Sequence, residues 1–244
     1  MQNSQYLFDY SESEIERLQR QAEMLRPITE RLLNSADVGK GMRVLDIGCG
    51  AGDVTILIAD RVGPTGRVIG IDRDKAVIDA ARRRISEIGF SNVDFIQRDL
   101  EHYDGTGDFD AAVCRYVLIH QTDPVRFLRA TRRLVRKGGM VAVHEMDSTR
   151  GIQSNPRVPL LHRIEVLMQA AFRQLGTAAD AGGRLVQLFV DAGMPVPQVF
   201  AETIVGSGED TILLPWFTAG LRAVLPRLIA TGVVSADEID IARC

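Results

Sequence analysis

The chain has few cysteines, no membrane-length apolar run and no excess of positive charge. Its three cysteines, Cys49, Cys114 and Cys244, form no CxxC pair, which argues against a disulfide framework or a zinc knuckle. The N-terminus has neither a basic start nor an apolar stretch, and no run of about 18 apolar residues occurs, so neither export nor a membrane span is expected. We therefore expect a reduced, cytoplasmic protein without a bound metal.

The charge balance argues against a nucleic-acid partner. The net charge is -3, whereas nucleic-acid surfaces concentrate an excess of lysine and arginine. Arginine runs at 82–84 and 132–133 fall in expected helices without interleaved aromatics, which is typical of solvated helix faces. Apolar residues make up 45% and charged residues 25% of the 244 positions, as in an ordinary globular protein.

Short apolar runs alternate with helical patterns between residues 43 and 147. The runs are "MRVLDIG", "RVIGID", "VDFIQRD", "FDAAVCRYVL" and "GMVAVHEMD". They are nearly continuous rather than alternating, which indicates strands covered on both faces, and the pattern predicts an α/β fold with a doubly wound, mostly parallel sheet. Asp123 and Pro124 predict the start of the last helix before the fifth strand, and Gly138-Gly139 predicts its end.

Helical segments flank this region. Ser11 and Glu14 predict a capping box at the start of an N-terminal helix. Beyond the fifth strand, "LLHRIEVLMQAAFRQLG", "GGRLVQLFVDAG" and "WFTAGLRAVLPRLIATG" predict helices, and "PQVFAETIVG" predicts a strand. No polar linker interrupts the chain, so a single domain is expected. Its expected parts are a helical lid at 1–36, a cofactor-binding core at 40–147, and cap helices with a C-terminal strand at 148–244.

The stretch "LDIGCGAGD" at 45–53 places three glycines at alternate positions after the first expected strand. A dinucleotide-binding turn needs glycine or alanine at its sixth position, where this chain has Asp53. A carboxylate there would repel phosphate groups at the helix N-terminus. The turn therefore suits a ligand without phosphates, and a nicotinamide-dependent oxidoreductase is disfavoured.

Four motifs in order, "VLDIGCGAGD", "VIGIDRD", "FIQRDL" and "LVRKGGMVAV", resemble those of class I S-adenosylmethionine-dependent methyltransferases. The segment "YLFDYSESEIERLQRQAEML" more loosely resembles the small-molecule, quinone-methylating branch. The resemblance implies S-adenosyl-L-methionine as cofactor, with Asp46 toward its ammonium group, Asp72 on the ribose hydroxyls and Asp99 on the adenine amino group. Further cofactor contacts implied by it are Tyr6, Tyr10, Gln21, Gly48, Cys49, Gly50, Gly52, Arg73, Leu100, Arg115 and His120.

Candidate catalytic side chains follow the fourth and fifth strands, at the edge where open α/β sheets bind ligands. His120 is the first choice for deprotonating an acceptor, and the alternative is that it shapes the cofactor pocket. His144 and Glu145 are further candidates, with a structural role as the stronger alternative. A base is not essential, because positioning can supply roughly 7 to 11 kcal/mol. Trp216 and Phe217, with the 152–176 helix, are candidates for an aromatic lid.

The expected activity is methyl transfer to oxygen, nitrogen or carbon of a small organic molecule, by a monomer or homodimer without nucleic-acid or membrane partners. "CRYV" stands where an NPPY-like run would mark methylation of exocyclic or amide nitrogens. The alternatives are a protein that binds S-adenosylmethionine without transferring methyl, an RNA methyltransferase and an oxidoreductase. The family's fold usually ends in a hairpin of sixth and seventh strands. No seventh is evident here, so we expect either a truncated chain or a short edge strand.

Overall fold

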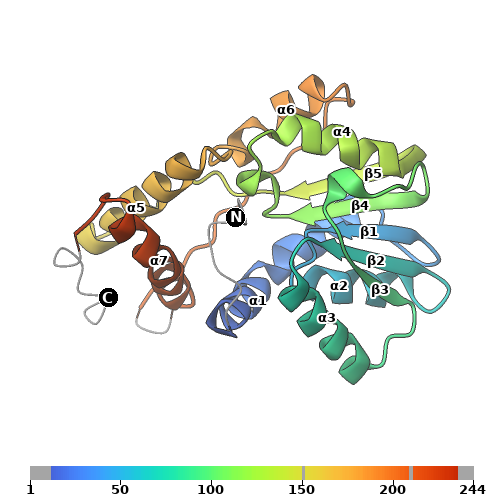
Figure 1. Ribbon diagram of the computed structural model, residues 1–244, viewed down its shortest axis with the longest axis horizontal. Coiled ribbons are helices and arrows are strands. Elements are labelled where there is room, and N and C mark those ends of the chain that lie inside the picture. The colour runs from blue at the N-terminus through green and yellow to red at the C-terminus, as the bar shows by residue number, and fades with distance from the viewer. Residues whose placement is uncertain (1–11, 150–151, 209–210, 236–244) are drawn as a thin grey trace.

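The computed structural model describes residues 12–149, 152–208 and 211–235 (Figure 1). Five parallel strands form one sheet in the order β3-β2-β1-β4-β5, which confirms the predicted doubly wound parallel sheet. The strands are β1 Arg43–Ile47, β2 Arg67–Asp72, β3 Val93–Gln97, β4 Phe109–Arg115 and β5 Val135–His144. The order reverses between β1 and β4, and ligands bind at the carboxyl ends of strands around such a point.

Helices cover both faces of the sheet (Figure 1). The helices are α1 Glu12–Ser35, α2 Asp53–Val62, α3 Lys75–Ile88, α4 Pro124–Leu134, α5 Pro159–Leu175, α6 Leu185–Asp191 and α7 Leu213–Ala230, with short 3-10 turns η1 Leu100–His102, η2 Leu118–His120 and η3 Gly182–Arg184. α1, α2 and α3 lie on one face, and α4 and α6 lie on the other. Asp123 accepts a hydrogen bond from Arg126 N, as its predicted capping role requires.

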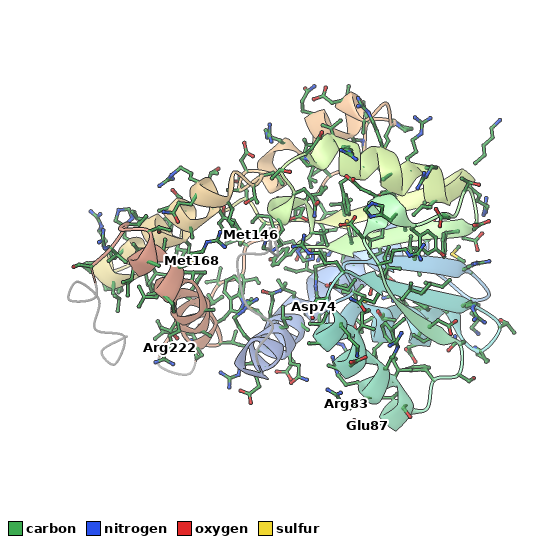
Figure 2. The ribbon with its side chains drawn as sticks, viewed as in Figure 1. Asp74, Arg83, Glu87, Met146, Met168 and Arg222 are labelled. Carbon is green, nitrogen blue, oxygen red and sulfur yellow. The ribbon has the colours of Figure 1, made fainter. Side chains whose placement is uncertain are left out.

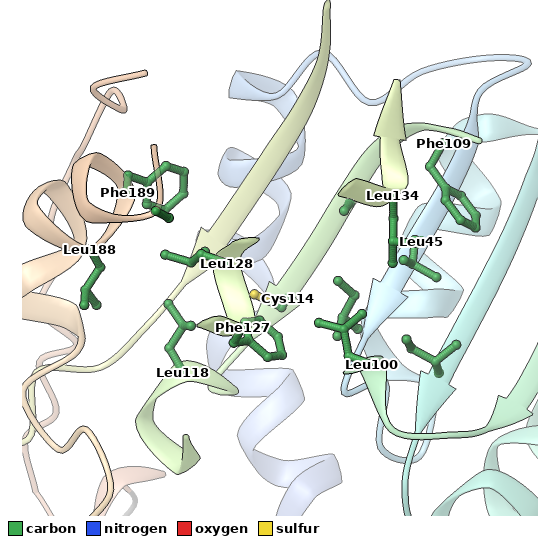
Figure 3. Packing of buried hydrophobic residues seen from close by; sticks show 14 of the residues in the cluster. Leu45, Leu100, Phe109, Cys114, Leu118, Phe127, Leu128, Leu134, Leu188 and Phe189 are labelled. Atoms are coloured by element: carbon green, nitrogen blue, oxygen red, sulfur yellow. The ribbon is translucent and has the colours of Figure 1, made fainter. Parts of the chain in front are cut away.

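The apolar runs of the strands are continuous because alternate residues enter two separate cores. In β4, Ala111 and Val113 pack with α1 and α2, whereas Ala112 and Cys114 pack toward α4 and α6. Figure 3 shows the second core, in which Phe109 and Leu128 are fully buried. A polar substitution on either face would therefore bury an unpaired group.

The cap is built on an apolar cluster shared by α5 and α7. Ile164 and Leu167 of α5 pack with Leu221 and Val224 of α7, and Ile119 of η2 joins the same cluster. α7 also contacts α1, which connects the cap to the sheet domain. By length and composition α7 passes as a candidate membrane span, a test that core helices of soluble proteins also pass.

The predicted end of the helix before β5 is wrong. α4 ends at Leu134, and Gly138-Gly139 lies inside β5. The register between β4 and β5 shifts after Phe109 pairs with Val135, so the glycines accommodate a bulge in an edge strand. Gly138 has a φ of 79°, and a Cβ on Gly139 would lie 2.5 Å from the Asp110 carbonyl oxygen.

The predicted strand "PQVFAETIVG" is also wrong. Its residues, 197–206, carry no strand pairing although they run beside the cavity described below. An apolar alternation becomes a strand only when a neighbouring backbone supplies hydrogen bonds, and within the described part of the chain β5 remains the sheet edge. Val205 is accordingly 85% exposed. Ser11 of the expected capping box and residues 236–244 lie outside the described residues.

Candidate cofactor and acceptor site

A cavity of about 2410 Å³ extends from the carboxyl ends of the strands, between the sheet, α1 and the cap, along β5 to the segment 194–206. Met146 and Met168 line it on the side of the cap (Figure 2). The predicted site residues that line it are Gln21, Gly48, Gly50, Asp72, Arg73, Asp99, Leu100, Arg115, His120, His144 and Glu145. Asp46, Cys49 and Gly52 lie behind its wall, and the predicted lid residues Tyr6 and Tyr10 lie outside the described residues.

The glycine turn after β1 has an open side and a packed side. The amides of Gly48 and Cys49 both donate to Ile71 O, which ties the turn to β2. Gly50 has a φ of 52°, and a Cβ built on it would meet nothing within 4 Å, because it faces the cavity. Gly52 is different, since its Cβ would contact Ala81 and Phe95 at 3.3 Å. Gly50 thus leaves room for a ligand, whereas Gly52 allows close packing of α2 against its neighbours.

Asp72 ends β2 and organises the adjoining wall. Its Oδ2 accepts from Gly50 N at 3.0 Å and its Oδ1 accepts from Asp74 N at 3.0 Å. Burial raises the pKa of Asp72 above its ordinary value, and these two hydrogen bonds oppose that rise. Each carboxylate oxygen can accept more than one hydrogen bond, so Asp72 retains the capacity to receive two hydroxyl donors from a ligand.

Asp46 lies beneath the floor of the cavity rather than in it. It is 1% exposed, and Thr55 Oγ1 donates to its Oδ2 at 2.6 Å. Burial raises the pKa of Asp46 to about 7, against the opposing effects of the Thr55 hydrogen bond and the positive charge of Arg115. Asp46 is not part of the cavity lining, so its side chain presents no atom to the cavity in this rotamer.

Arg115 connects the end of β4 to α1. Its Nη1 donates to Thr29 Oγ1 at 3.1 Å, and Thr29 in turn donates to Leu25 O. Burial lowers the pKa of Arg115, while Asp53 and Asp46 oppose that change. The guanidinium therefore holds α1 over the cavity and balances the carboxylates below the floor.

Asp99 and Leu100 form the wall beyond β3. Asp99 is exposed, and its Oδ1 accepts from Glu101 N at 3.0 Å, which caps η1. Leu100 is 5% exposed and also belongs to the core on the α4 side. Their neighbour in the cavity wall, Arg73, follows Asp72 directly. A polar acceptor beside an apolar surface is suited to a flat heterocycle with an amino group.

His120 ends η2 and faces the cavity beside an aromatic ring. The ring centroids of His120 and Phe172 are 6.0 Å apart. Burial lowers the pKa of His120 to about 3, and the positive charges of Arg73 and Arg17 lower it further. The imidazole is therefore neutral near pH 7 and only weakly basic.

Glu145 is engaged with the backbone of the turn that carries His120. Its Oε1 accepts from Val117 N at 2.7 Å and Leu118 N at 2.6 Å, and its Oε2 accepts from Ile119 N at 3.3 Å. Burial raises the pKa of Glu145 to about 8, and these hydrogen bonds oppose the rise. The geometry is that of a positioning residue.

His144 lies on β5 opposite Arg115 of β4. Its ring meets that of Tyr116 edge-on, at 5.1 Å between centroids and 64° between planes. Burial lowers the pKa of His144 to about 4, and Arg115 lowers it further. Its Nδ1 is buried and has no hydrogen-bond partner in the part of the chain that the structure describes.

The arginine runs also serve the fold, which the interpretation as solvated faces missed in part. Arg83 does point outward from α3, beside Glu87 (Figure 2). Arg84 instead donates to Ala51 O at 2.6 Å and to Asp53 Oδ1 at 2.8 Å, and it holds the glycine turn from behind. The sequence offered one signal for this contact. An acidic residue, Asp53, begins α2, and a basic residue, Arg84, lies on the next helix, α3.

A second network was missed at the cap side of the cavity. Arg17 Nη1 donates to Gln21 Oε1 at 3.0 Å, and Trp216 Nε1 donates to the same oxygen at 3.1 Å. Arg17 and Gln21 are only 6% and 7% exposed. Their spacing of four residues on α1 places both on one helix face, and that pattern was visible in the sequence.

Comparison with known proteins agrees with this geometry. A family model described as a methyltransferase domain matches residues 38–186. The chain belongs to the class I S-adenosylmethionine-dependent methyltransferases. The fold of this methyltransferase resembles that of an S-adenosylmethionine-dependent methyltransferase from Aquifex aeolicus, with a TM-score of 0.53 at 19% identity over 68% of this chain and 78% of that one.

Curated relatives of this methyltransferase have varied names. Aklanonic acid methyltransferase DauC of Streptomyces sp. (strain C5) is 34% identical over 58% of this chain and 67% of its own length. The ubiquinone/menaquinone biosynthesis C-methyltransferase UbiE of Pseudomonas fluorescens is 36% identical over 45% of this chain and 44% of its own. A 37.1 kDa protein in transposon TN4556 of Streptomyces fradiae is 30% identical over 84% of this chain and 57% of its own length. The chain thus spans about half to two thirds of these relatives.

Proposed function

We propose that this chain binds S-adenosylmethionine at the glycine turn and transfers its methyl group to a small organic molecule held under the cap. The observation that carries the proposal is the pairing of Gly50 and Asp72. An open glycine and a carboxylate with spare acceptor capacity meet at 3.0 Å at the carboxyl ends of β1 and β2, on the wall of a large cavity. The names of the relatives DauC and UbiE support a small-molecule acceptor.

The residues in the wall fit the three parts of this cofactor. Asp72 would receive the ribose hydroxyls, Asp99 the adenine amino group, and Leu100 the face of the adenine. The backbone at Gly48 and Gly50 would run beside the methionine part, whose ammonium group is attracted by the buried Asp46. When bound, S-adenosylmethionine supplies an electrophilic methyl group on a positively charged sulfur.

The chain's own contribution on the acceptor side is mainly positioning. Glu145 fixes η2, and η2 presents His120 to the cavity opposite Phe172. A neutral imidazole can accept a hydrogen bond from an acceptor hydroxyl and so orient it. Alignment of donor and acceptor can supply roughly 7 to 11 kcal/mol, more than a weak base would add.

The experiment that tests the function measures binding and turnover separately. Calorimetry with S-adenosylmethionine and S-adenosylhomocysteine should show one site, and mass spectrometry should detect S-adenosylhomocysteine formed with quinol, phenol or carboxylic acid acceptors. Binding without turnover on any acceptor would favour the alternative of a protein that binds the cofactor without transferring methyl. Absence of binding would refute the proposal.

We also propose that residues 1–36, 40–147 and 148–244 act as lid, core and cap of a single cytoplasmic domain, as a monomer or homodimer. Hydrogen bonds tie α1 to the core through Arg115 and to the cap through Trp216, which supports one domain with three connected parts. Cys49 and Cys114 are buried, and neither forms a disulfide within the described residues. Sedimentation velocity with and without S-adenosylhomocysteine would give the oligomeric state.

A further inference from the structure

Tyr116 adopts a backbone conformation that residues other than glycine rarely occupy. Its φ is 57°, and among the described residues Asp37 is the only other non-glycine residue with a positive φ. Aspartate tolerates this left-handed region, whereas a bulky side chain is strained in it. Glycine would remove the strain at position 116, so the presence of tyrosine there requires a reason in its side chain. Strained positions of this kind cluster at ligand-binding sites.

Hydrogen bonds on both sides of Tyr116 hold the strained turn in place. Tyr116 N donates to His144 O at 2.8 Å, and the amides of the next three residues all donate to the Glu145 carboxylate. Consecutive amides that converge on one anion fix the backbone of a turn. The ring of Tyr116 packs against the apolar cluster shared by α5 and α7, so the turn delivers this ring to the cap side of the site.

The hydroxyl group of Tyr116 has no hydrogen-bond partner among the described residues, although Tyr116 lines the cavity. Nor is Tyr116 Oη one of the fully enclosed polar atoms without a partner, which include His144 Nδ1. An oxygen that is neither bonded nor enclosed can be reached from the cavity. Burial raises the pKa of Tyr116 above its ordinary value, and the negative charge of Glu145 raises it further. The hydroxyl group therefore keeps its proton and can donate it in a hydrogen bond to a ligand.

His144 of β5 is the second polar group at this place. Its ring meets the Tyr116 ring edge-on, at 5.1 Å between centroids, and it lines the same cavity. Its Nδ1 is enclosed and its Nε2 is not, and neither nitrogen has a hydrogen-bond partner within residues 12–149, 152–208 and 211–235. Burial lowers the pKa of His144 to about 4, so near pH 7 one nitrogen carries a proton and the other a lone pair. Nε2 therefore offers the cavity one donor or one acceptor.

Apolar side chains surround this pair on the cap side. Met146 and Met168 pack against the same cluster as Tyr116, and both line the cavity (Figure 2). The charged residues that line the whole cavity have both signs, and they are Asp72, Asp99, Glu101, Asp123, Glu145, Asp147, Glu165, Glu202, Arg17, Arg73, Arg98, Arg115, Arg126, Arg132, Arg136, Lys137 and Asp37. A ligand group at Tyr116 and His144 is therefore selected by hydrogen bonds rather than by an excess of one charge.

We propose that Tyr116 and His144 form a hydroxyl-recognition pair, in which one neutral hydroxyl group of the acceptor contacts both Tyr116 Oη and His144 Nε2. This inference rests on the proposed function, because it names the residues that orient the acceptor in that same site. A hydroxyl group both donates and accepts, so it satisfies the pair whichever nitrogen of His144 carries the proton. A carbonyl oxygen only accepts, so it fits only the tautomer with the proton on Nε2. The strained turn fixes the phenol of Tyr116 at this position before the acceptor binds.

The test measures the binding of small probes by NMR of the whole chain labelled with 13C-methyl methionine, with and without saturating S-adenosylhomocysteine. Met146 and Met168 report on the cap side of the cavity, and Met140 of β5 is the reference signal. Phenol is compared with toluene, which has the same shape without the hydroxyl group. Cyclohexanol is compared with cyclohexanone, which has a carbonyl group instead. Each alcohol should shift Met146 and Met168 and bind at least about fivefold tighter than its partner.

Variants assign the preference for phenol over toluene to the pair. Y116F removes only the hydroxyl group, and H144F keeps an aromatic ring beside Tyr116, so each should reduce the preference at least about twofold. Y116F should leave stability in urea unchanged, because the lost hydroxyl group has no partner among the described residues. Y103F is the matched control, since Tyr103 packs against the core on the α4 side and does not line the cavity. Circular dichroism and S-adenosylhomocysteine affinity verify that each variant is folded.

The outcomes separate this inference from the proposed function. If S-adenosylhomocysteine does not bind, the proposed function fails, while the NMR measurements without it still decide the role of the pair. If S-adenosylhomocysteine binds but phenol shifts neither Met146 nor Met168, the hydroxyl-recognition pair is wrong. Toluene binding as tightly as phenol, or cyclohexanone as tightly as cyclohexanol, would also overturn it. An unchanged preference in Y116F, or a lost preference in Y103F, would have the same consequence.

Discussion

Glu145 Oε1 lies 2.6 Å from the amide nitrogen of Leu118, so a carboxylate at the end of β5 fixes the first turn after β4. Val117 donates to the same oxygen and Ile119 to the other. The turn carries His120 into the cavity, which means that the shape of the acceptor site depends on a residue that need not touch the acceptor. Because Glu145 is buried and holds η2 through hydrogen bonds, the position of His120 depends on whether the Glu145 carboxyl group is protonated.

Replacement of Glu145 by alanine should destabilise the fold by about 2–4 kcal/mol, because three buried amides lose their acceptor. Urea unfolding followed by circular dichroism measures the change. Glutamine at the same position keeps one acceptor oxygen and should cost less. Glu87→Ala is the control, since Glu87 is exposed on α3 and should change stability by less than about 0.5 kcal/mol. Equal effects at the two sites would contradict the positioning role.

The stability of the protein should fall as pH rises from 6.5 to 8. The pKa of Asp46 is raised to about 7 and that of Glu145 to about 8, so the folded chain keeps protons that the unfolded chain has released. Each such group lowers the free energy of unfolding by up to about 1.4 kcal/mol per pH unit as pH rises, until the pH exceeds the pKa of that group in the folded chain. Unfolding in urea at half-unit pH steps gives the slope.

The histidines act in the opposite direction at lower pH. His120 and His144 have pKa values lowered to about 3 and about 4, so below pH 6.5 the unfolded chain binds protons that the folded chain does not. Their contribution raises stability with pH and partly cancels that of the carboxyls. E145Q should therefore flatten the decline above pH 6.5, and a decline of unchanged slope in that variant would exclude Glu145 as its source.

The five strands could be predicted from the sequence because each is a short, continuous apolar segment, as expected for a strand that is covered on both faces. The motif residues Gly50, Asp72 and Asp99 could be placed at one edge, because carboxyl ends of parallel strands meet there. The segment 197–206 could not be predicted in the same way. Its alternating apolar residues fit a strand, but the sequence does not show whether a neighbouring strand is there to pair with it. Gly138-Gly139 was misassigned because a helix end and an edge bulge both use glycine.

The polar networks of the site were harder to predict than its strands. Arg17 was overlooked because a cation on an amphipathic helix is typical of a solvated face, whereas the structure buries it beside Gln21, which also accepts from Trp216 of α7. Glu145 was predicted as a catalytic candidate with a structural alternative, and its three amide contacts favour the alternative. Such roles depend on where backbone amides converge, which local sequence does not specify.

Asp72→Asn should weaken binding of S-adenosylhomocysteine by at least about tenfold, because an amide nitrogen replaces one of the two acceptor oxygens. Calorimetry measures the affinity. Asp74→Asn is the comparison, since Asp74 caps α3 through bonds to Ala76 N and Val77 N and asparagine can cap equally well. An affinity that is unchanged in D72N, or that falls equally in D74N, would refute the ribose assignment.

Gly50→Ala and Gly52→Ala should separate ligand binding from stability. Both glycines have positive φ, so each alanine should cost about 1–2 kcal/mol in backbone strain. At Gly50 the new methyl group enters the cavity and should greatly reduce S-adenosylhomocysteine affinity with no further loss of stability. At Gly52 it contacts Ala81 and Phe95 at 3.3 Å, so unfolding should become easier than in G50A while the cofactor wall stays open. Thermal unfolding and calorimetry on both variants measure the two effects, and equal loss of affinity in G52A would mean that the packed side of the turn also contacts the ligand.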